Sequence, residues 1–339
     1  MIALSVNDIS LEYGTEVILN KINFSINEGD RLGVVGVNGA GKSTLLKIIC
    51  GNINPSSGNV YIGKGKSISM LEQNAMLDSE LSVFEEMLAA FPEQVMLEKK
   101  IAEAEEKIHS GENSDKIIEE YTSLTERFKD VGGYEYRGRI KSMLLRFGFP
   151  ENMHTLSIKS LSGGERTRLS LIRHLLSEPD ILILDEPTVA VDPQSRNKIL
   201  EGILQLNREG ATIIYTSHYM EEVEQICTRI AIMDKGSKIA EGTTEELKRM
   251  IKNTETITAE ILQLPENVRE QIEALEHVYN VSYADNKLVA RCTGGRHNLI
   301  EILKILQENQ VGFGSVYSEQ PTLNDVFLEI TGKALRDKE

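Results

Sequence analysis

The chain has 339 residues, of which 40% are hydrophobic and 26% charged, a composition that supports folded domains and excludes a disordered or repetitive chain. Its formal net charge of -15 argues against general electrostatic binding to nucleic acid. The three cysteines, Cys50, Cys227 and Cys292, stand far apart without metal-ligand spacing, which suits a reducing compartment. No apolar run approaches the length of a membrane span, so we expect any membrane role to come through a partner chain.

The first 35 residues alternate short apolar runs with turns, which predicts an antiparallel β subdomain. Tyr13 stands at the turn that follows a predicted strand at residues 9–11. A flat aromatic ring at this place is able to stack on an adenine base. A lone tyrosine is more often a core or surface residue, and only its position ahead of the next motif singles it out.

Residues 36–44 read G-V-N-G-A-G-K-S-T, between an apolar run that predicts a buried parallel strand and apolar residues at helical spacing. Strand, glycine loop and helix are the context of a P-loop, whose backbone N–H groups and helix dipole face a phosphate. Lys42 would reach the outer phosphates, and Ser43 would place its hydroxyl on a magnesium ion. The predicted nucleotide-binding residues of this stretch are Gly36, Asn38, Gly39, Ala40, Gly41, Lys42, Ser43 and Thr44.

Residues 60–62 and 68–71 are predicted strands, and Gln73 follows the second of them. An amide at this strand end is able to contact the magnesium ion or the attacking water.

Residues 82–147 are predicted to be helical and amphipathic. Apolar residues recur at alternating four- and three-residue steps on both sides of the polar turn at residues 110–115, which predicts an antiparallel helical hairpin. The repeat consists of Leu97, Ile101, Ala104 and Ile108, then Ile117, Tyr121, Leu124 and Phe128. The remaining faces are mainly Glu and Lys with acid in excess, which fits a solvated arm and a docking arm equally well.

Residues 161–165 read L-S-G-G-E and stand immediately before an amphipathic helix. Ser162 is the predicted cap of that helix, and the amides of Gly163 and Gly164 lie at its positive end, so the stretch is a second predicted anion site.

The apolar run at residues 181–184 predicts a fully buried parallel strand that ends in Asp185 and Glu186. Ligands bind at the carboxyl ends of strands in α/β sheets, so both carboxylates are expected to face the P-loop. Asp185 would hold magnesium through water, and Glu186 would orient or deprotonate the attacking water. His218 also follows a predicted strand, residues 212–216, and is expected to reach a γ-phosphate.

From about residue 253 the composition changes, and predicted strands and helices follow one another in a small α+β pattern. The strands are predicted at residues 256–262, 279–283, 287–292 and 315–317, and the helices at 268–275 and 298–307. The last helix, residues 323–330, is expected to pack across this domain.

In this order the motifs resemble those of the ATP-binding cassette (ABC) family over residues 1 to about 245. Tyr13 corresponds to the A-loop, residues 36–44 to Walker A, Gln73 to the Q-loop, residues 161–165 to the signature and residues 181–186 to Walker B. Asp192 corresponds to the D-loop and His218 to the switch histidine. The resemblance implies an ATPase that uses Mg²⁺, with Glu186, His218 and Gln73 catalytic and Ser43, Gln73 and Asp185 at the metal.

The resemblance also implies the architecture and the assembly. The expected fold class is α/β, a P-loop NTPase of ABC type with a RecA-like core, an antiparallel β subdomain and a helical subdomain. This nucleotide-binding domain would occupy residues 1–250, and a small accessory α+β domain residues 251–339. Two such domains, in a homodimer or a heterodimer, would sandwich two ATP molecules, so that Ser162, Gly163 and Gly164 contact the γ-phosphate held by the other domain. Asp192 is also among the expected nucleotide-binding residues.

The chain resembles two different subfamilies, one before and one after about residue 177. The first part resembles the first domain of the ABC-F translation factors, on residues 71–73, the helical arm and residues 132–135. The rest resembles the ATPase subunits of drug or sodium exporters, on residues 188–196, 215–222 and 321–328.

Three functions follow from these resemblances. The first is the ATPase of an exporter, at the cytoplasmic face of the membrane, that drives a separate permease through ATP-dependent dimerisation. The alternative is an ABC-F-like ribosome-associated translation or antibiotic-resistance factor, although its second cassette is missing and the arm is acidic rather than basic. The third is a chain that binds ATP without coupling to a partner.

Overall fold

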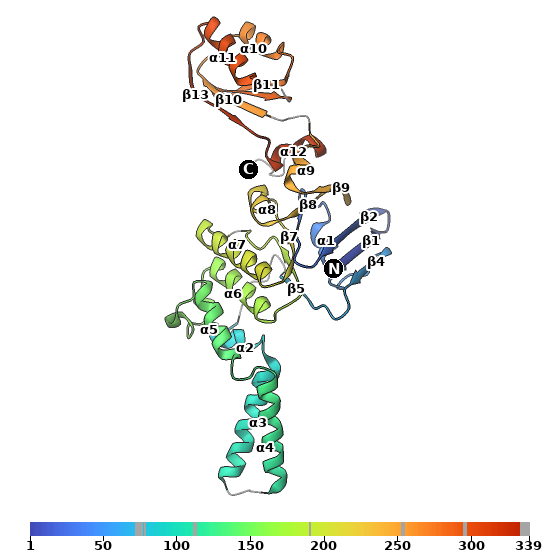
Figure 1. Cartoon of the computed structure of the whole chain (residues 1–339), viewed down its shortest axis with the longest axis vertical. Helices are drawn as coiled ribbons and strands as arrows, with labels where there is room; N and C mark the ends of the chain where they lie inside the picture. Colours follow the sequence, from blue (N-terminus) through green and yellow to red (C-terminus); the bar gives the residue numbers. More distant parts are fainter. Residues whose placement is uncertain are drawn as a thin grey trace. The chain divides into compact units, whose positions relative to one another are not determined.

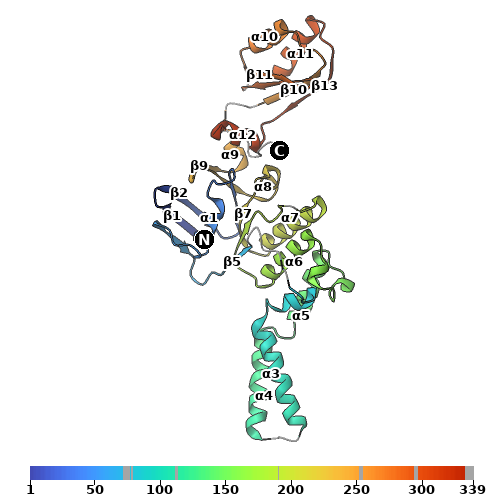
Figure 2. The same ribbon diagram turned by 180° about the vertical axis from the view of Figure 1, so that it is seen from behind.

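The computed structural model describes residues 1–71, 77, 79–110, 114–189, 191–251, 255–293 and 297–332 (Figures 1 and 2). Its contacts divide the chain into two compact units. Unit 1 comprises residues 1–9, 23–31 and 43–217, and unit 2 comprises residues 10–22, 32–42 and 218–339. Within the described part of the chain, no helix has both the length and the apolar character that crossing a bilayer requires.

Three parallel strands lie at the centre of unit 1. They pair in the order β5 (Ile68–Leu71), β6 (Ile181–Asp185) and β7 (Thr212–Thr216). Every residue of β6 and β7 is buried, which is the pattern of strands covered on both faces. The predicted buried strand is therefore confirmed, and the pairing places Asp185 opposite Thr216.

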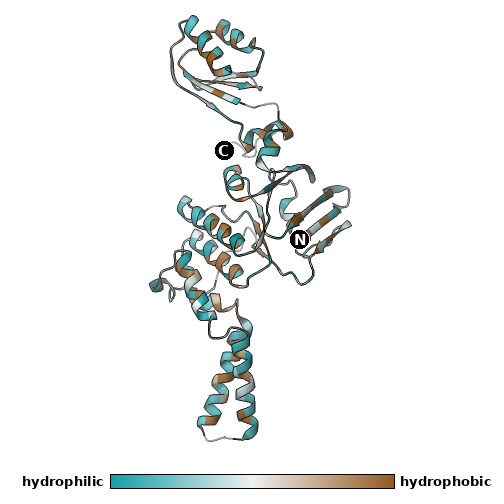
Figure 3. Ribbon diagram, in the orientation of Figure 1, coloured by the Kyte–Doolittle hydropathy of each residue, from teal (hydrophilic) through white to brown (hydrophobic). Residues whose placement is uncertain are grey.

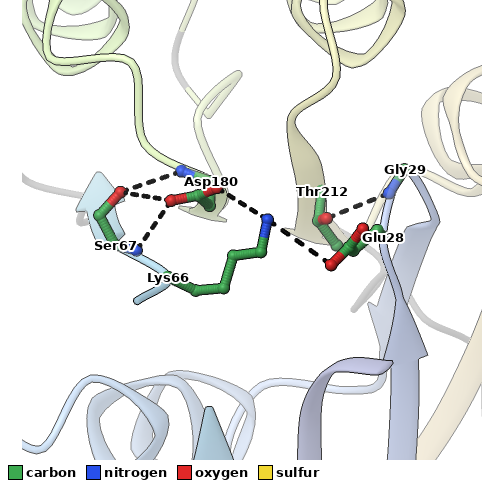
Figure 4. A network of polar contacts seen from close by, with 6 residues as sticks. All are labelled: Glu28, Gly29, Lys66, Ser67, Asp180 and Thr212. Carbon is green, nitrogen blue, oxygen red and sulfur yellow. Dashed lines mark hydrogen bonds and ion pairs between the residues drawn. The ribbon is translucent and has the colours of Figure 1, made fainter. Parts of the chain in front are cut away.

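A polar cluster joins the amino ends of these strands (Figure 4). The Asp180 carboxylate accepts hydrogen bonds from the N–H and hydroxyl of Ser67, both at 3.0 Å, and pairs with Lys66 at 2.9 Å. Lys66 also lies 3.6 Å from Glu28, and the Thr212 hydroxyl accepts the Gly29 N–H at 3.1 Å. Polar side chains therefore provide hydrogen-bond partners for backbone groups where these strands begin. This edge of the sheet is opposite the predicted catalytic end.

Three further helices of unit 1 pack around the signature helix α6 (Gly163–Leu176). Both α5 and α7 contact it, and α2 contacts both α5 and α6. Arg173 of α6 pairs with the buried Glu86 of α2 at 2.7 Å. The bounds are α2 (Val83–Leu88), α5 (Tyr136–Arg146) and α7 (Pro193–Arg208), with short 3₁₀ turns at Glu151–Met153 and Ile158–Ser160.

The predicted hairpin is present as α3 (Pro92–His109) and α4 (Asp115–Asp130), which pack along each other. Leu97, Ala104 and Phe128 are buried, and the rest of the predicted seam is half-buried. Figure 3 shows hydrophobic and hydrophilic positions interleaved along both helices. At the base, Glu98 accepts hydrogen bonds from Tyr136 at 2.6 Å and Arg137 at 2.7 Å, which ties the hairpin to α5.

A three-stranded sheet has the order β2-β1-β4. Its strands are β1 (Ile2–Tyr13), β2 (Glu16–Asn27) and β4 (Ser57–Ile62), and a turn at residues 14–15 joins β1 to β2. In the second unit, β8 (Arg229–Asp234) pairs in parallel with β3 (Arg31–Val35) and antiparallel with β9 (Ser237–Gly242). The short helices α8 (Met220–Ile226) and α9 (Thr244–Lys248) belong to the same unit.

The predicted strands and helices of the carboxyl-terminal region are all present. Four antiparallel strands have the order β11-β12-β10-β13, and their core includes buried residues of two helices. The bounds are β10 (Glu255–Ile261), α10 (Glu266–Glu273), β11 (Val278–Ala284), β12 (Lys287–Cys292), α11 (Asn298–Glu308) and β13 (Phe313–Glu319).

The final helix α12 (Leu323–Thr331) differs from the expectation. Its apolar face packs against α8 and α9, and its buried residues Leu323 and Phe327 lie outside the core of the small sheet, while its Asp325 carboxylate lies 3.9 Å from Arg291 of β12. The Leu323 N–H donates to the Glu224 carboxylate of α8 at 3.3 Å. A short amphipathic helix buries its apolar stripe on whichever surface is nearest in space, and sequence pattern alone does not reveal that surface.

Candidate functional site

The glycine loop connects β3 to α1 (Lys42–Ile49). Gly39 and Gly41 have φ values of 80° and 96°, which non-glycine residues rarely adopt. A Cβ on Gly36 would lie 2.5 Å from the carbonyl oxygen of Met233, so this position also requires glycine. The left-handed glycines and the close approach of Met233 therefore fix the path of the loop backbone, as a phosphate cradle requires.

Lys42 lies over this loop. Its side chain is buried, and its Nζ donates to the carbonyls of Gly36 at 2.8 Å and Val37 at 3.4 Å. Ser43 and Thr44 follow in the first turn of α1 and are half-buried, whereas Asn38 is exposed. An ammonium group held across the mouth of the loop is positioned to meet an anionic ligand.

Tyr13 is the last residue of β1 and is 60% exposed. It belongs to unit 2 together with the glycine loop up to Lys42. The ring is accessible to a ligand, and its role in adenine stacking remains a prediction.

Thr216 holds the acidic pair at the end of β6. Its hydroxyl donates to Oδ1 of Asp185 at 2.7 Å and accepts the N–H of Glu186 at 2.9 Å. Asp185 and Glu186 are only 3% and 8% exposed, and Glu186 has a φ of 47°, an uncommon left-handed conformation. The Asp185 carboxylate and the Glu186 backbone are thus fixed where the parallel strands end. Sequence reasoning missed Thr216, although a hydroxyl that ends a buried apolar strand was a usable signal.

The signature stretch begins α6 with a reciprocal cap. The Ser162 hydroxyl accepts the Glu165 N–H at 3.3 Å, and the Glu165 carboxylate accepts the Ser162 N–H at 2.8 Å, which confirms the predicted cap. A Cβ on Gly163 would meet no atom within 4 Å. A Cβ on Gly164 would lie 3.1 Å from Oδ2 of Asp192, so the two motifs are in contact within unit 1.

Asp192 caps the next helix, because its Oδ1 accepts the Ser195 N–H at 2.9 Å. Hydrogen bonds from Ser195 hold the pKa of Asp192 below its ordinary value. The carboxylate is therefore ionised at neutral pH and joins the start of α7 to the signature glycine.

His218 and Gln73 are the two remaining candidate site residues, and only His218 lies among the described residues. His218 follows β7 and is half-buried, and its ring packs on Tyr219 with centroids 4.2 Å apart. Gln73 lies outside the described residues, so its predicted contact with magnesium or water remains a prediction.

A parallel sheet, a glycine loop at a helix start and a buried acidic pair at a strand end define a P-loop nucleoside triphosphatase. The model of the ABC transporter family matches residues 19–189, half of the chain. A second model, the C-terminal domain of DrrA1-3-like ATP-binding proteins, matches residues 242–331. The chain belongs to the ABC transporter family and is an ATPase of that family.

Individual relatives extend this assignment. The linearmycin resistance ATP-binding protein LnrL of Bacillus subtilis is 33% identical over 98% of this chain and all of its own length. The Nod factor export ATP-binding protein I of Rhizobium etli is 27% identical over 99% of this chain and 95% of that protein. The putative ATP-binding protein YdiF of Bacillus subtilis is 41% identical, over 57% of this chain and 30% of that protein.

Solved structures agree on the fold. The structure described as the ATP-binding subunit of an ABC transporter has a TM-score of 0.56 at 24% identity, covering 73% of this chain and 92% of that one. The predicted fold class is confirmed, and so is the prediction of an ATP-binding subunit of an exporter-type ABC transporter.

Proposed function

We propose that the chain binds Mg²⁺-ATP through residues 36–44, hydrolyses it with Glu186, and thereby drives export through a separate permease. The observation that carries this proposal is the buried pair Asp185 and Glu186, fixed by Thr216 at the carboxyl end of β6. Two neighbouring buried carboxylates are costly unless a cation or a positioned reaction partner compensates them. This cost supports a metal-assisted reaction at that strand end.

The residues present fit a magnesium ion, which prefers oxygen ligands and keeps several waters. Ser43 would offer its hydroxyl, Asp185 its second carboxylate oxygen and Gln73 its amide oxygen. When bound, the ion would neutralise charge on the phosphates. Lys42 and the loop amides would hold the phosphates in place, and Tyr13 would stack on the adenine.

Glu186 is the proposed general base. Its carboxylate would accept a hydrogen bond from the attacking water and take up its proton as the bond from water oxygen to the γ-phosphorus forms. The γ-phosphate leaves ADP at the same time. His218 would contact the γ-phosphate and stabilise its charge.

A second copy of the chain is the proposed partner for the signature. A Cβ on Gly163 would meet no atom within 4 Å. Ser162 and Gly164 lie with it at the positive end of the 14-residue helix α6. Across a dimer these residues would receive the γ-phosphate held by the other copy. Asp192 contacts Gly164 and would thereby connect the two copies of the site.

The permease would hold the chain at the cytoplasmic face of the membrane, and the relatives named for resistance and export support this placement. The α3–α4 arm and the resemblance of the first part of the sequence to ABC-F proteins leave one rival, a ribosome-associated factor. The export function fits relatives that match almost the whole chain. The rival function fits only the first part of the chain, which carries the resemblance to ABC-F proteins.

Cell fractionation of Glu186→Gln distinguishes these functions. The variant should bind ATP without hydrolysing it and should therefore remain associated with its partner. We expect it to sediment with membranes and to bring a permease with it. Lys42→Ala is the matched control, since it should bind ATP about 100-fold more weakly and accumulate less on membranes. Recovery of Glu186→Gln in the ribosomal pellet would refute the export function and favour the rival.

A further inference from the structure

A cleft of about 430 Å³ lies between the end of α5 and the exposed side of α7. Phe147 and Gly202 form its floor, where the two helices approach so closely that a Cβ on Gly202 would lie 2.2 Å from the Phe147 ring. Its size falls in the range of small-molecule sites. All of its lining residues belong to unit 1, and none belongs to the motifs described above.

Cations dominate the cleft although the whole chain is acidic, with a net charge of -15. Arg146, Lys198 and Arg208 line it, against one carboxylate, Glu201, among the described lining residues. The Arg146 guanidinium pairs with Glu209 at 3.1 Å outside the cleft, and Arg208 donates to the amide oxygen of Gln205 at 3.4 Å. Within the described part of the chain, Lys198 forms no ion pair.

A buried guanidinium stands behind Lys198. Arg168 of α6 is 6% exposed, and its Nη1 donates to the carbonyl of Phe147 at 3.2 Å while its Nε has no hydrogen-bond partner among the described residues. A Cβ on Gly148 would lie 2.7 Å from Nζ of Lys198 and 3.2 Å from Nη1 of Arg168. The two cationic nitrogens are therefore no more than about 6 Å apart. Like charges this close repel, and an anion between or beside them would remove the repulsion.

We propose that this cleft is an anion-binding site for a phosphate-bearing small molecule, separate from the ATP site. Lysine and arginine supply the charge, and the forked guanidinium groups supply directional donors that match phosphate oxygens. The site does not depend on the proposed ATPase mechanism, because it shares no residue with it.

Calorimetric titration of the full chain with inorganic pyrophosphate tests the site. ADP at saturating concentration first occupies the P-loop, so that a further binding event reports a second site. We expect saturable binding to the wild-type chain, weakened at least about tenfold by Lys198→Glu and about threefold by Lys198→Gln. Lys141→Glu is the matched control on the exposed side of α5, outside the cleft, and should change the affinity less than about twofold.

The outcomes decide the proposal. Absence of saturable binding to the wild-type chain would overturn it, as would wild-type affinity in Lys198→Glu. Equal weakening by Lys198→Glu and Lys141→Glu would also overturn it, because the effect would then reflect net charge alone. Lys198→Gln keeps the test valid if charge reversal impairs folding.

Discussion

The two glycine-rich helix starts of this chain look alike in sequence and differ in structure. In the loop at residues 36–42, Gly39 and Gly41 adopt left-handed conformations, and Lys42 donates to carbonyls of the same loop. In the signature, Ser162 and Glu165 cap the helix reciprocally, and Gly163 has open space where a side chain would be. The first motif is closed on itself, and the second is a capped helix end with an open position at Gly163.

This difference assigns the motifs different tasks. A closed loop with its own cation can hold a phosphate within one chain. A capped helix with an open glycine offers charge complementarity but no enclosure, so it needs a second surface to complete a site. Changes in the first motif should therefore affect ATP binding, and changes in the second should affect turnover by the assembled protein.

Lys42→Ala should have the largest effect. Removing the ammonium group that we propose faces the phosphates should weaken ATP binding about 100-fold, because a charged hydrogen-bonded partner would be lost. Binding of a fluorescent ATP analogue measures this. Lys47→Ala, later in the same helix, should bind normally, and an equal loss in both variants would contradict the role assigned to Lys42.

Gly163→Asp should keep ATP binding and lower turnover about 30-fold, because a carboxylate would face the γ-phosphate bound by the other copy. Gly138→Asp is a matched control, since Gly138 is also in the first turn of a helix and a Cβ there meets nothing within 4 Å. Steady-state phosphate release measures turnover. Normal turnover in Gly163→Asp would show that the signature is not at an interface.

Thr216→Val should lower turnover about tenfold and destabilise the fold by about 1–3 kcal/mol. The change removes the hydrogen bonds to Asp185 and to the Glu186 N–H and leaves that buried N–H unsatisfied. Phosphate release and urea unfolding measure the two effects. Thr216→Ser keeps the hydroxyl and should stay near wild type, and if it behaves like Thr216→Val then packing rather than hydrogen bonding is responsible.

Motifs whose chemistry is local were predictable from the sequence. The Ser162 cap depends on residues three apart, and the hairpin seam from Leu97 to Phe128 follows from helical spacing. Thr216 was missed because its role depends on the register that places it opposite Asp185, which a sequence pattern does not specify. The position of α12 was mispredicted for a related reason, since its apolar stripe did not reveal which surface would cover it.

Asp180→Asn should have the smallest effect and should not alter turnover, since Asp180 lies at the opposite ends of the strands. Hydrogen bonds from Ser67 and the pairing with Lys66 lower the pKa of Asp180 to about 2. An aspartate has a pKa of about 3.9 in the unfolded chain, so its stabilising contribution is present above pH 4 and disappears as the pH falls towards 2.

Because the Asp180 side chain is 36% exposed, its contribution should be below about 1 kcal/mol. Urea unfolding of wild type and Asp180→Asn at pH 6 and pH 3 measures it. The difference between them should shrink at the lower pH, and a difference that grew on acidification would contradict the assigned ion pair.

The central claim is that two copies of this chain enclose ATP and that Glu186 is the base that hydrolyses it. The most direct measurement is the light-scattering mass of purified Glu186→Gln at micromolar concentration, with and without Mg²⁺-ATP. Without nucleotide we expect the mass of one chain, 37.9 kDa, and with Mg²⁺-ATP we expect twice that mass. A variant that binds ATP but keeps the mass of one chain, or that hydrolyses ATP at the wild-type rate, would contradict the claim.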